Sequence, residues 1–388
     1  MSNQNRLNSA VHGWSLEDIA IVPQKRTVDP DDVTLDWELE SFRFELPLMG
    51  SAMDSAVSPT TAIEIGRLGG LAVLNLEGLW TRYDDPGPVF REIAALDPKT
   101  ATARIQELYD RPIKPELITQ RIQEMRQAGI TTAASLTPAR VRRYYRYAQA
   151  GGLDLLVIQG TVVSAEHISS KPDTLDLAEF IQELLKEELP VVVGNCANFS
   201  TAKNLMKTGA MGVLVGIGPG GACTSRRVMA VGVPQATAIA DAVWAREVIH
   251  KRTGRWCQVI ADGGMSTSGV LAAALAIGAD AVMIGSPLAS AHEAPGLGYH
   301  WGMATSDLNT PRGVRVEVER RGSLEEILLG PAHDSDGRNN LFGGVRMAIA
   351  SCGYTDPRSF QDAEVMIAPS IRTEGKALQT AQQVGMGN

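Results

Sequence analysis

Eight short apolar runs, separated by segments of helical character, constrain the fold of this chain more than any other feature. Most of them carry apolar residues at successive positions instead of alternating with polar ones. Strands of that kind are buried on both faces, as in a parallel sheet that helices cover. The eight runs are Leu46–Gly50, Leu71–Asn75, Thr131–Leu136, Leu153–Ile158, Pro190–Gly194, Met211–Val215, Gln258–Ala261 and Asp280–Ile284.

Capping residues and amphipathic spacing predict helices between these strands. The clearest starts are Thr137-Pro138-Ala139 before Val141–Gln149, Ser200 before Ala202–Lys207, and Ser268 before Val270–Ile277. Eight strands that alternate with helices predict a closed TIM (β/α)₈ barrel. A doubly wound sheet is the alternative, but its last strands would be edge strands, whereas these appear fully buried.

We expect residues 1–370 to form this single barrel domain and residues 371–388 to form a flexible tail, since the tail has little apolar content. A polar, helical stretch, 83–127, separates the second and third strands. After the eighth strand, 286–321 is expected to be loop with one short strand at Val314–Glu319.

Charge and composition exclude several classes of partner. The net charge is −8, from 44 acidic and 36 basic residues, and no Lys/Arg stripe is interleaved with aromatics, so a nucleic-acid polymer is not expected. The N-terminus has no apolar signal core, and no stretch approaches the ~18 apolar residues of a membrane span. We therefore expect a cytoplasmic protein without a membrane partner.

The four cysteines form no CxxC pair, and the histidines have no metal-ligand spacing, so disulfides, zinc and a catalytic metal are not expected. Cys223 differs from the others because it follows the sixth strand within Gly216-Ile217-Gly218-Pro219-Gly220-Gly221-Ala222-Cys223-Thr224-Ser225. A glycine-rich loop there exposes the thiol at the catalytic rim and lets backbone N–H groups approach an anion. Cys223 is the candidate nucleophile, Cys196 is a weaker one, and Cys257 and Cys352 are predicted to lie in the core.

Two further loops have the form of a phosphate site, which barrels build after their seventh and eighth strands. Asp262-Gly263-Gly264 follows the seventh strand and Gly285-Ser286 follows the eighth. The glycine turns allow main-chain donors to hold a phosphate, while Asp262 can accept hydrogen bonds from ribose hydroxyls. Plain turn glycines with a helix-capping aspartate are the alternative.

Motifs in the same order along residues 14–370 resemble the IMP dehydrogenase/GMP reductase family. The motifs are Leu16-Glu17-Asp18-Ile19-Ala20-Ile21-Val22-Pro23, Ser51-Ala52-Met53-Asp54, the Cys223 loop with Gly232-Val233-Pro234-Gln235, Ala261-Asp262-Gly263-Gly264, Gly285-Ser286 and Gly302-Met303. The chain is most similar to the branch without paired CBS domains, because their usual insertion point falls in the short segment 83–127.

The resemblance implies that Cys223 adds to C2 of the purine of IMP, that hydride passes to NAD, and that water then releases XMP. It also implies roles for other residues. Those implied for the nucleotide are Ser51, Met53, Gly221, Asp262, Gly264, Gly285, Ser286, Gly302 and Met303, with Ser225 at the place of a catalytic threonine. Those implied for the cofactor are Gln159, Gly160, Thr161, Asn195, Gly216 and Gly218, and the carbonyls of Gly218, Gly220 and Cys223 are a possible potassium site.

Some positions depart from the family pattern. Gln159 replaces a cofactor-contacting aspartate, and Leu76 stands where reductases have a lysine. The flap before Gly313 is short and lacks an Arg-Tyr pair, and Arg312 stands where a glutamine or glutamate is usual. Arg312 or Arg315 is then the candidate group for activating water. NAD-dependent IMP dehydrogenase is the favoured function, in a homotetramer or octamer; a GMP reductase and a purine-nucleotide-binding regulatory homologue remain alternatives.

Overall fold

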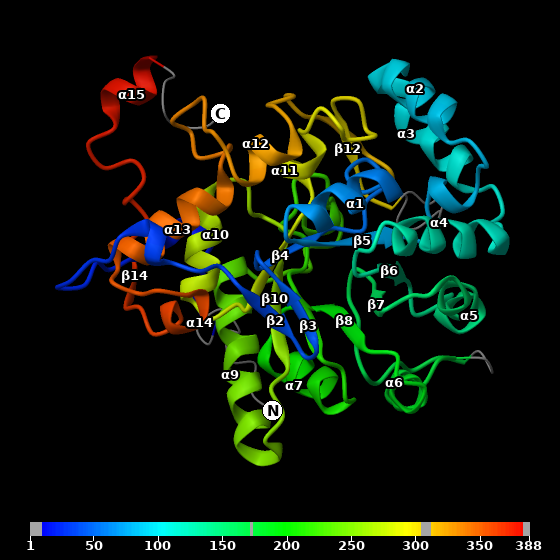
Figure 1. Cartoon of the computed structure of the whole chain (residues 1–388), viewed down its shortest axis with the longest axis horizontal. Coiled ribbons are helices and arrows are strands. Elements are labelled where there is room, and N and C mark those ends of the chain that lie inside the picture. Colours follow the sequence, from blue (N-terminus) through cyan, green and yellow to red (C-terminus); the bar gives the residue numbers. More distant parts are fainter. Residues whose placement is uncertain (1–9, 171–173, 304–311, 383–388) are drawn as a thin grey trace, which may run out of the picture.

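The computed structural model describes residues 10–170, 174–303 and 312–382, and its centre is a closed barrel of eight parallel strands (Figure 1). The last strand pairs with the first, Val282 beside Leu48, so the predicted barrel is confirmed and the doubly wound alternative is wrong. The strands are β4 (Leu48–Gly50), β5 (Leu71–Asn75), β6 (Ala133–Leu136), β7 (Leu155–Gln159), β8 (Val191–Cys196), β9 (Gly212–Val215), β10 (Gln258–Asp262) and β11 (Ala281–Ile284).

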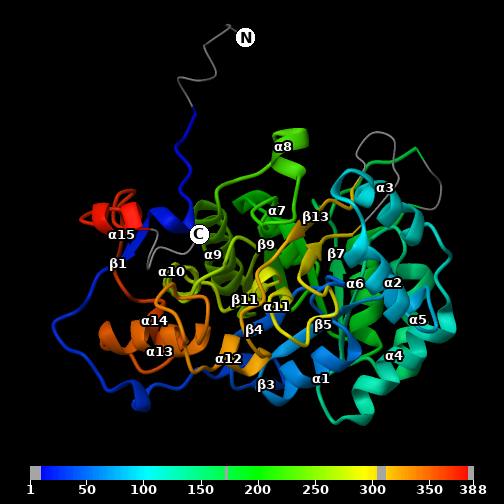
Figure 2. The ribbon, with the colours of Figure 1, turned by 90° about the horizontal axis from the view of Figure 1, so that it is seen from above.

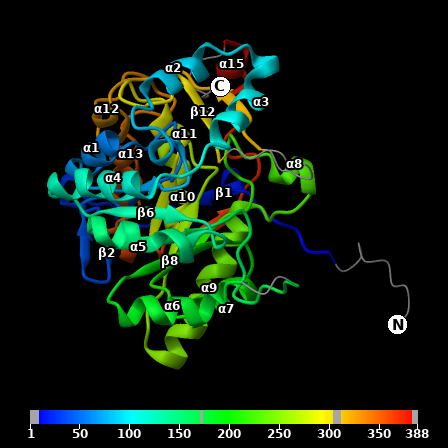
Figure 3. The ribbon, with the colours of Figure 1, turned by 90° about the vertical axis from the view of Figure 1, so that its right-hand side faces the viewer.

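Helices cover the outside of the barrel, as Figures 1 and 3 show, and bury the outer face of the strands. The larger ones are α1 (Pro59–Arg67), α4 (Pro115–Gln127), α5 (Val141–Gly151), α6 (Leu177–Lys186), α7 (Phe199–Lys207), α9 (Gln235–Thr253), α10 (Ser268–Ala276) and α13 (Leu341–Ser351). Shorter helices are α8 (Ser225–Met229), α11 (Ser286–Ala289), α12 (Leu324–Leu328) and α14 (Pro357–Phe360).

The predicted helices exist, but α7 and α10 begin a few residues earlier than expected. The N-cap of α7 is Asn198, whose side chain accepts from Thr201 N, so Ser200 lies inside the first turn. The N-cap of α10 is Thr267 instead of Ser268. The α5 helix begins at Val141, as expected, and the Thr137 carbonyl accepts from Arg140 N and Val141 N at 3.0 and 2.9 Å.

A hairpin that the sequence analysis missed closes the amino-terminal end of the barrel. It consists of β2 (Trp37–Leu39) and β3 (Phe42–Phe44), and its buried Trp37, Leu39 and Phe44 pack against inward-facing strand residues such as Met49 and Leu71. Gln258 at the start of β10 bonds Trp37 Nε1 and the Glu38 carbonyl, at 3.2 and 3.1 Å. Apolar side chains therefore fill the amino-terminal end of the barrel, and the carboxyl-terminal end remains open.

The stretch between β5 and β6 is helical, as predicted. It holds the 3-10 turn η4 (Leu79–Thr81), α2 (Gly87–Ala95), α3 (Pro98–Tyr109) and α4. The segment after β11 contains the predicted strand, β13 (Arg315–Glu317), and also α11 and β12 (Tyr299–Trp301), which the sequence did not indicate; β12 pairs antiparallel with β13. A separate apolar cluster joins α2 and α3 to Trp301.

The two ends of the barrel domain meet in a small sheet outside the barrel. Strand β1 (Ile19–Ile21) pairs antiparallel with β14 (Val365–Ile367), beside α10 (Figure 2). Within the expected tail, Ala377–Gln382 forms the short helix α15, which has no buried residue. Mobility of that tail stays a prediction.

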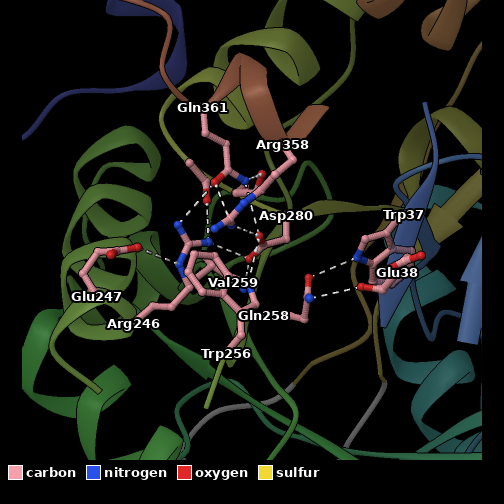
Figure 4. A network of polar contacts seen from close by, with 12 residues as sticks. Trp37, Glu38, Arg246, Glu247, Trp256, Gln258, Val259, Asp280, Arg358 and Gln361 are labelled. Carbon is pink, nitrogen blue, oxygen red and sulfur yellow. Dashed lines mark hydrogen bonds and ion pairs between the residues drawn. The ribbon is translucent and has the colours of Figure 1, made fainter. Parts of the chain in front are cut away.

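A buried ion pair fixes α9 and α14 to the amino-terminal end of the barrel (Figure 4). Asp280, just before β11, accepts from Arg246 on α9 at 2.7 Å and from the Val259 backbone at 2.7 Å. The Arg246 and Arg358 guanidinium groups both lie over the Trp256 ring, at 4.0 and 3.6 Å from its centroid. Charges removed from water in this way depend on one another.

We expect Asp280→Asn to lower the free energy of unfolding by about 3 kcal/mol, because it leaves Arg246 buried without its main counter-charge. This loss is at the lower end of the range of about 3–5 kcal/mol for removing one partner of a buried ion pair. The reason is that Glu247 still lies 3.4 Å from Arg246. Glu38→Gln is the matched control, because its ion pair with Arg43 is exposed and should contribute less than about 1 kcal/mol. Urea unfolding of both variants measures the difference; equal losses would contradict the assignment.

Candidate functional site

A cavity of about 770 Å³ opens at the carboxyl end of the barrel strands, where loops after β4, β6, β7, β8, β9, β10 and β11 converge. Its volume is in the range of small-molecule sites, roughly 300–1,000 Å³. Except for Arg315 and the weaker candidate Cys196, the site residues that the sequence indicated line it. They are Ser51, Met53, Gln159, Gly160, Thr161, Asn195, Gly216, Gly218, Gly220, Gly221, Cys223, Ser225, Asp262, Gly264, Gly285, Ser286, Gly302, Met303 and Arg312. Their individual roles stay predictions.

Cys223 is the exposed thiol in this cavity. Its backbone N donates to the Gly220 carbonyl at 2.9 Å, which closes a tight turn, and its Sγ lies 3.3 Å from the Ser225 hydroxyl. Cys196, Cys257 and Cys352 are buried, and burial raises the pKa of the Cys196 thiol to about 12. The weaker expectation for Cys196 is therefore wrong, and the core positions of Cys257 and Cys352 are confirmed.

Glycines allow the β10 loop to touch the cysteine loop. Gly263 and Gly264 have φ of +83° and +77°, a left-handed conformation that favours glycine. A Cβ on Gly263 would lie 3.1 Å from Gly220 N, and one on Gly264 would lie 3.0 Å from Pro219 Cβ. Their conformation therefore favours glycine, a Cβ at either position would crowd the thiol loop, and the two glycines bring the predicted phosphate turn beside that loop.

Asp262 is the centre of a hydrogen-bonded group of side chains. Its Oδ2 accepts from Asn195 Nδ2 at 2.7 Å and from Gln159 Nε2 at 3.1 Å. Burial raises the pKa of Asp262 to about 6, although the two amide donors oppose that shift. The Gln159 amide, which was expected to contact a cofactor, thus donates to Asp262. The other carboxylate oxygen, Asp262 Oδ1, accepts no hydrogen bond from the described residues.

Arg312 lines the cavity and makes two hydrogen bonds to other parts of the chain. Its Nη1 donates to Thr161 Oγ1 at 2.6 Å, and its backbone carbonyl accepts from Gln106 on α3 at 2.8 Å. Arg315 does not line the cavity: its guanidinium donates to the carbonyls of Ala94 and Leu96, at 3.2 and 2.8 Å, at the end of α2. Arg315 is therefore a helix-capping group, and the suggestion that it could activate water is corrected.

Several lining residues were not found from the sequence. His300 is buried, bonds Ser55 Oγ through Nδ1 at 2.9 Å, and has its pKa lowered by burial to about 4, so it is neutral at pH 7. Glu317, Glu319, Arg321 and Arg338 reach the cavity from β13 and the segment after it. In the sequence His300 has no metal-ligand spacing that would single it out. No local pattern shows which face a β13 residue presents.

The described residues contain no group of three His, Cys, Asp or Glu side chains placed to hold a metal ion. Potassium at the carbonyls of Gly218, Gly220 and Cys223 stays a prediction; the Gly220 carbonyl accepts from Cys223 N. Among the helices of the described part, none is long and apolar enough to cross a membrane.

Comparison with known proteins agrees with the resemblance. Residues 13–306 match the model of the IMP dehydrogenase / GMP reductase domain, and the chain belongs to that family. An IMP dehydrogenase/GMP reductase-like protein of Corynebacterium glutamicum, known from its crystal structure, has a TM-score of 0.87 and 40% identity, over 92% of this chain and 95% of that one.

More specific names differ among the relatives. An uncharacterized oxidoreductase of Mycolicibacterium smegmatis is 44% identical over 90% of this chain and 94% of its own length. The inosine-5′-monophosphate dehydrogenase of Cryptosporidium parvum is 30% identical over 90% of both chains. The chain is thus an oxidoreductase of the IMP dehydrogenase/GMP reductase family. Between β5 and β6 the structure has only η4 and α2–α4, so no CBS domains are inserted there.

The raised pKa of Asp262 predicts how its replacement affects stability. Because the folded-state pKa, about 6, lies above the ordinary value of 3.8, ionising Asp262 costs folding free energy, and that cost develops as pH rises from about 4 to 6. Asp262→Asn, which stays neutral, should gain stability relative to the wild type over this range. Chemical denaturation at a series of pH values measures the gain.

Asp18→Asn is the control for that measurement. Bonds from Ser15 lower the pKa of Asp18, so its contribution is present above the ordinary pKa and is lost only as pH falls below it. The stability difference between Asp18→Asn and the wild type should therefore stay flat from pH 5 to 7, roughly one unit above the unperturbed value. A flat difference for Asp262→Asn as well would contradict the raised pKa.

Proposed function

We propose that this chain is an IMP dehydrogenase, which oxidises IMP to XMP with NAD through a covalent adduct on Cys223. The observation that carries the proposal is the exposed Cys223 thiol, 3.3 Å from the Ser225 hydroxyl, in the same cavity as Asp262 and Ser286. A thiol presented beside hydroxyl and carboxylate groups suits nucleophilic attack on a bound nucleotide.

The cavity provides matching groups for each part of a purine nucleoside 5′-monophosphate. The backbone of Gly264, Gly285 and Ser286 suits the phosphate, and the Asp262 carboxylate suits the ribose hydroxyls. Met53 suits the base, since its Sδ and Cε lie 3.0 and 3.9 Å from where Cβ atoms on Gly285 and Gly302 would be.

In the proposed reaction the Cys223 thiolate bonds to C2 of IMP, and the hydrogen on C2 leaves with its electron pair, which gives a thioimidate. Water then bonds to C2 and loses a proton, and the carbon–sulfur bond breaks to return the thiolate and release XMP. Ser225 accepts the thiol proton in a hydrogen bond before attack. Overall, IMP, NAD⁺ and water give XMP, NADH and one proton.

When bound, a nicotinamide cofactor would supply the acceptor for the hydride. Gly160, Thr161, Gly216 and Gly218 fit it, because they line the same cavity as Cys223 with backbone groups and one hydroxyl. Asn195 and Gln159 would contact the cofactor less directly, because their amide nitrogens donate hydrogen bonds to Asp262.

A specific observation also favours GMP reduction as a second candidate. Arg312 donates to Thr161, which suits a charged guanidinium rather than the neutral base that water activation requires. Glu317 and Glu319 line the same cavity, and a carboxyl group there could give a proton to departing ammonia. GMP, NADPH and two protons would then give IMP, NADP⁺ and ammonium.

One assay separates these functions: absorbance of the reduced nicotinamide with IMP and NAD⁺ in one cuvette and with GMP and NADPH in another. NADH formation from IMP supports the proposal. NADPH loss with GMP alone replaces it by the reductase. Tight nucleotide binding with no turnover in either cuvette would identify a regulatory homologue and overturn the proposal.

Cys223→Ala should abolish turnover while it leaves IMP affinity within about tenfold, because the thiol acts in the covalent step and contributes little to binding. Steady-state absorbance and calorimetry measure the two quantities. Cys352→Ala is the control, since that thiol is buried beside α13, away from the cavity. Undiminished turnover without the Cys223 thiol would end its assignment as nucleophile.

Arg312→Ala tests the hydrolysis step. If Arg312 activates water, the variant should still release a burst of about one NADH per active site and then turn over slowly, because adduct formation does not need the base. Thr161→Val keeps the guanidinium but removes its hydroxyl partner, so it should show a weaker form of the same slow phase. In rapid-mixing experiments, steady-state rates within a few-fold of wild type for both variants would show that Arg312 is only a surface residue.

A further inference from the structure

A second buried carboxylate, Asp54, lies directly behind the cavity and has no role in the proposed reaction. Its Oδ2 accepts from Tyr109 Oη at 2.5 Å and from Leu79 N at 2.9 Å. Tyr109 Oη in turn accepts from Trp301 Nε1 at 2.9 Å. The donors therefore run in one direction, from the Trp301 indole through the Tyr109 hydroxyl to the carboxylate.

The Asp54 carboxylate is poorly suited to a purely structural role. Its Oδ1 is buried and accepts no hydrogen bond from any described residue, which costs folding free energy. Gly78 leaves room for the carboxylate, since a Cβ on Gly78 would lie 2.1 Å from both of its oxygens. An unsatisfied buried oxygen held beside an obligatory glycine needs an explanation beyond local stability.

Asp54 and Trp301 belong to the two chain segments that are proposed to hold the purine base. Asp54 follows Met53, and Trp301 precedes Gly302 and Met303. The segments also meet where Trp301 N donates to Ser55 Oγ at 3.3 Å. Ser55 Oγ also bonds His300 Nδ1 at 2.9 Å. The Tyr109 bridge is thus a further connection between the two segments, and it is made through a helix that lies outside the barrel.

Helix α3, which carries Tyr109, is itself anchored beside the cavity. The apolar cluster of α2 and α3 includes Phe90, whose ring lies 6.0 Å from that of Trp301, and Figure 1 shows these helices at the same end of the molecule as β12. Gln106, one turn before Tyr109, bonds the Arg312 carbonyl. One helix therefore contacts both of the segments proposed to bind the base and Arg312, which lines the cavity.

We propose that Tyr109 is a positioning residue: by bridging Asp54 and Trp301, it holds the Met53 and Gly302 segments at the separation that receives the purine base. This inference rests on the proposed function for the identity of the ligand. It assigns a binding role to α3, which supplies no residue to the cavity lining. Side chains locked from behind in this way keep a site preorganised.

The charge on Asp54 provides a signal for this bridge. Burial raises the pKa of Asp54 to about 6, while the Tyr109 and Leu79 hydrogen bonds and the charge of Arg82 oppose the shift. His300, across Ser55, has a pKa of about 4 and stays neutral above pH 5. Loss of the Tyr109 hydroxyl removes the larger hydrogen-bond contribution, so the pKa of Asp54 should rise further.

Tyr109→Phe is the test, and Tyr83→Phe is its matched control. Tyr83 packs against the same apolar cluster and donates to the Leu108 carbonyl on α3 at 3.1 Å, but it touches neither Asp54 nor Trp301. We expect Tyr109→Phe to weaken IMP binding in calorimetry by about tenfold, the upper range for one lost hydrogen bond, and Tyr83→Phe to change it less than about twofold. Equal effects of the two variants would overturn the inference.

A measurement without ligand separates this inference from the proposed function. The methyl signal of Met53, labelled with ¹³C and assigned with Met53→Leu, should titrate near pH 6 in the wild type and at higher pH in Tyr109→Phe. Asp262 also titrates near pH 6, so Asp54→Asn must remove the Met53 response while Asp262→Asn leaves it. A Met53 signal that is the same in Tyr109→Phe and Tyr83→Phe overturns the inference even if IMP is turned over; a shifted midpoint supports it even if IMP is not.

Discussion

The pairing of β11 with β4 is the constraint on which the rest of the structure depends. It closes the sheet, so every strand is buried on both faces and no edge remains. Polar side chains that must reach a ligand are then restricted to the strand ends. The β2–β3 hairpin fills one end with apolar side chains, which leaves the carboxyl end as the place where loops can converge on a cavity.

The chemistry at that end depends on close backbone packing as much as on side chains. Gly263 and Gly264 let the β10 loop rest against Pro219 and Gly220, so the predicted phosphate turn and the thiol loop share one wall. Larger residues would separate the two loops. The position of Cys223 relative to the β10 loop is therefore a result of glycine placement on both loops.

Two buried carboxylates show a conflict between stability and function. Burial raises the pKa of both Asp54 and Asp262 to about 6, so each ionised form opposes folding near neutral pH. Hydrogen bonds from the amides of Asn195 and Gln159 partly offset the cost of burying the charge of Asp262. Hydrogen bonds from Tyr109 and Leu79 do the same for Asp54. Folding alone would favour neutral residues at both positions, and their carboxylates are therefore best explained by the site.

The sequence by itself determined that strands buried on both faces alternate with helices, because fully apolar runs such as Val191–Val193 are typical of such strands, and it determined the thiol loop, because four glycines around Cys223 disfavour a core position. Closure of the sheet into a barrel was decided by the pairing of β11 with β4. Tertiary structure alone decided what depends on distant contacts. Gln159 turns to Asp262, Arg315 caps α2, and Tyr109 reaches Asp54 across 55 residues. Local periodicity records which face of an element is apolar, but not which polar partner a buried side chain meets.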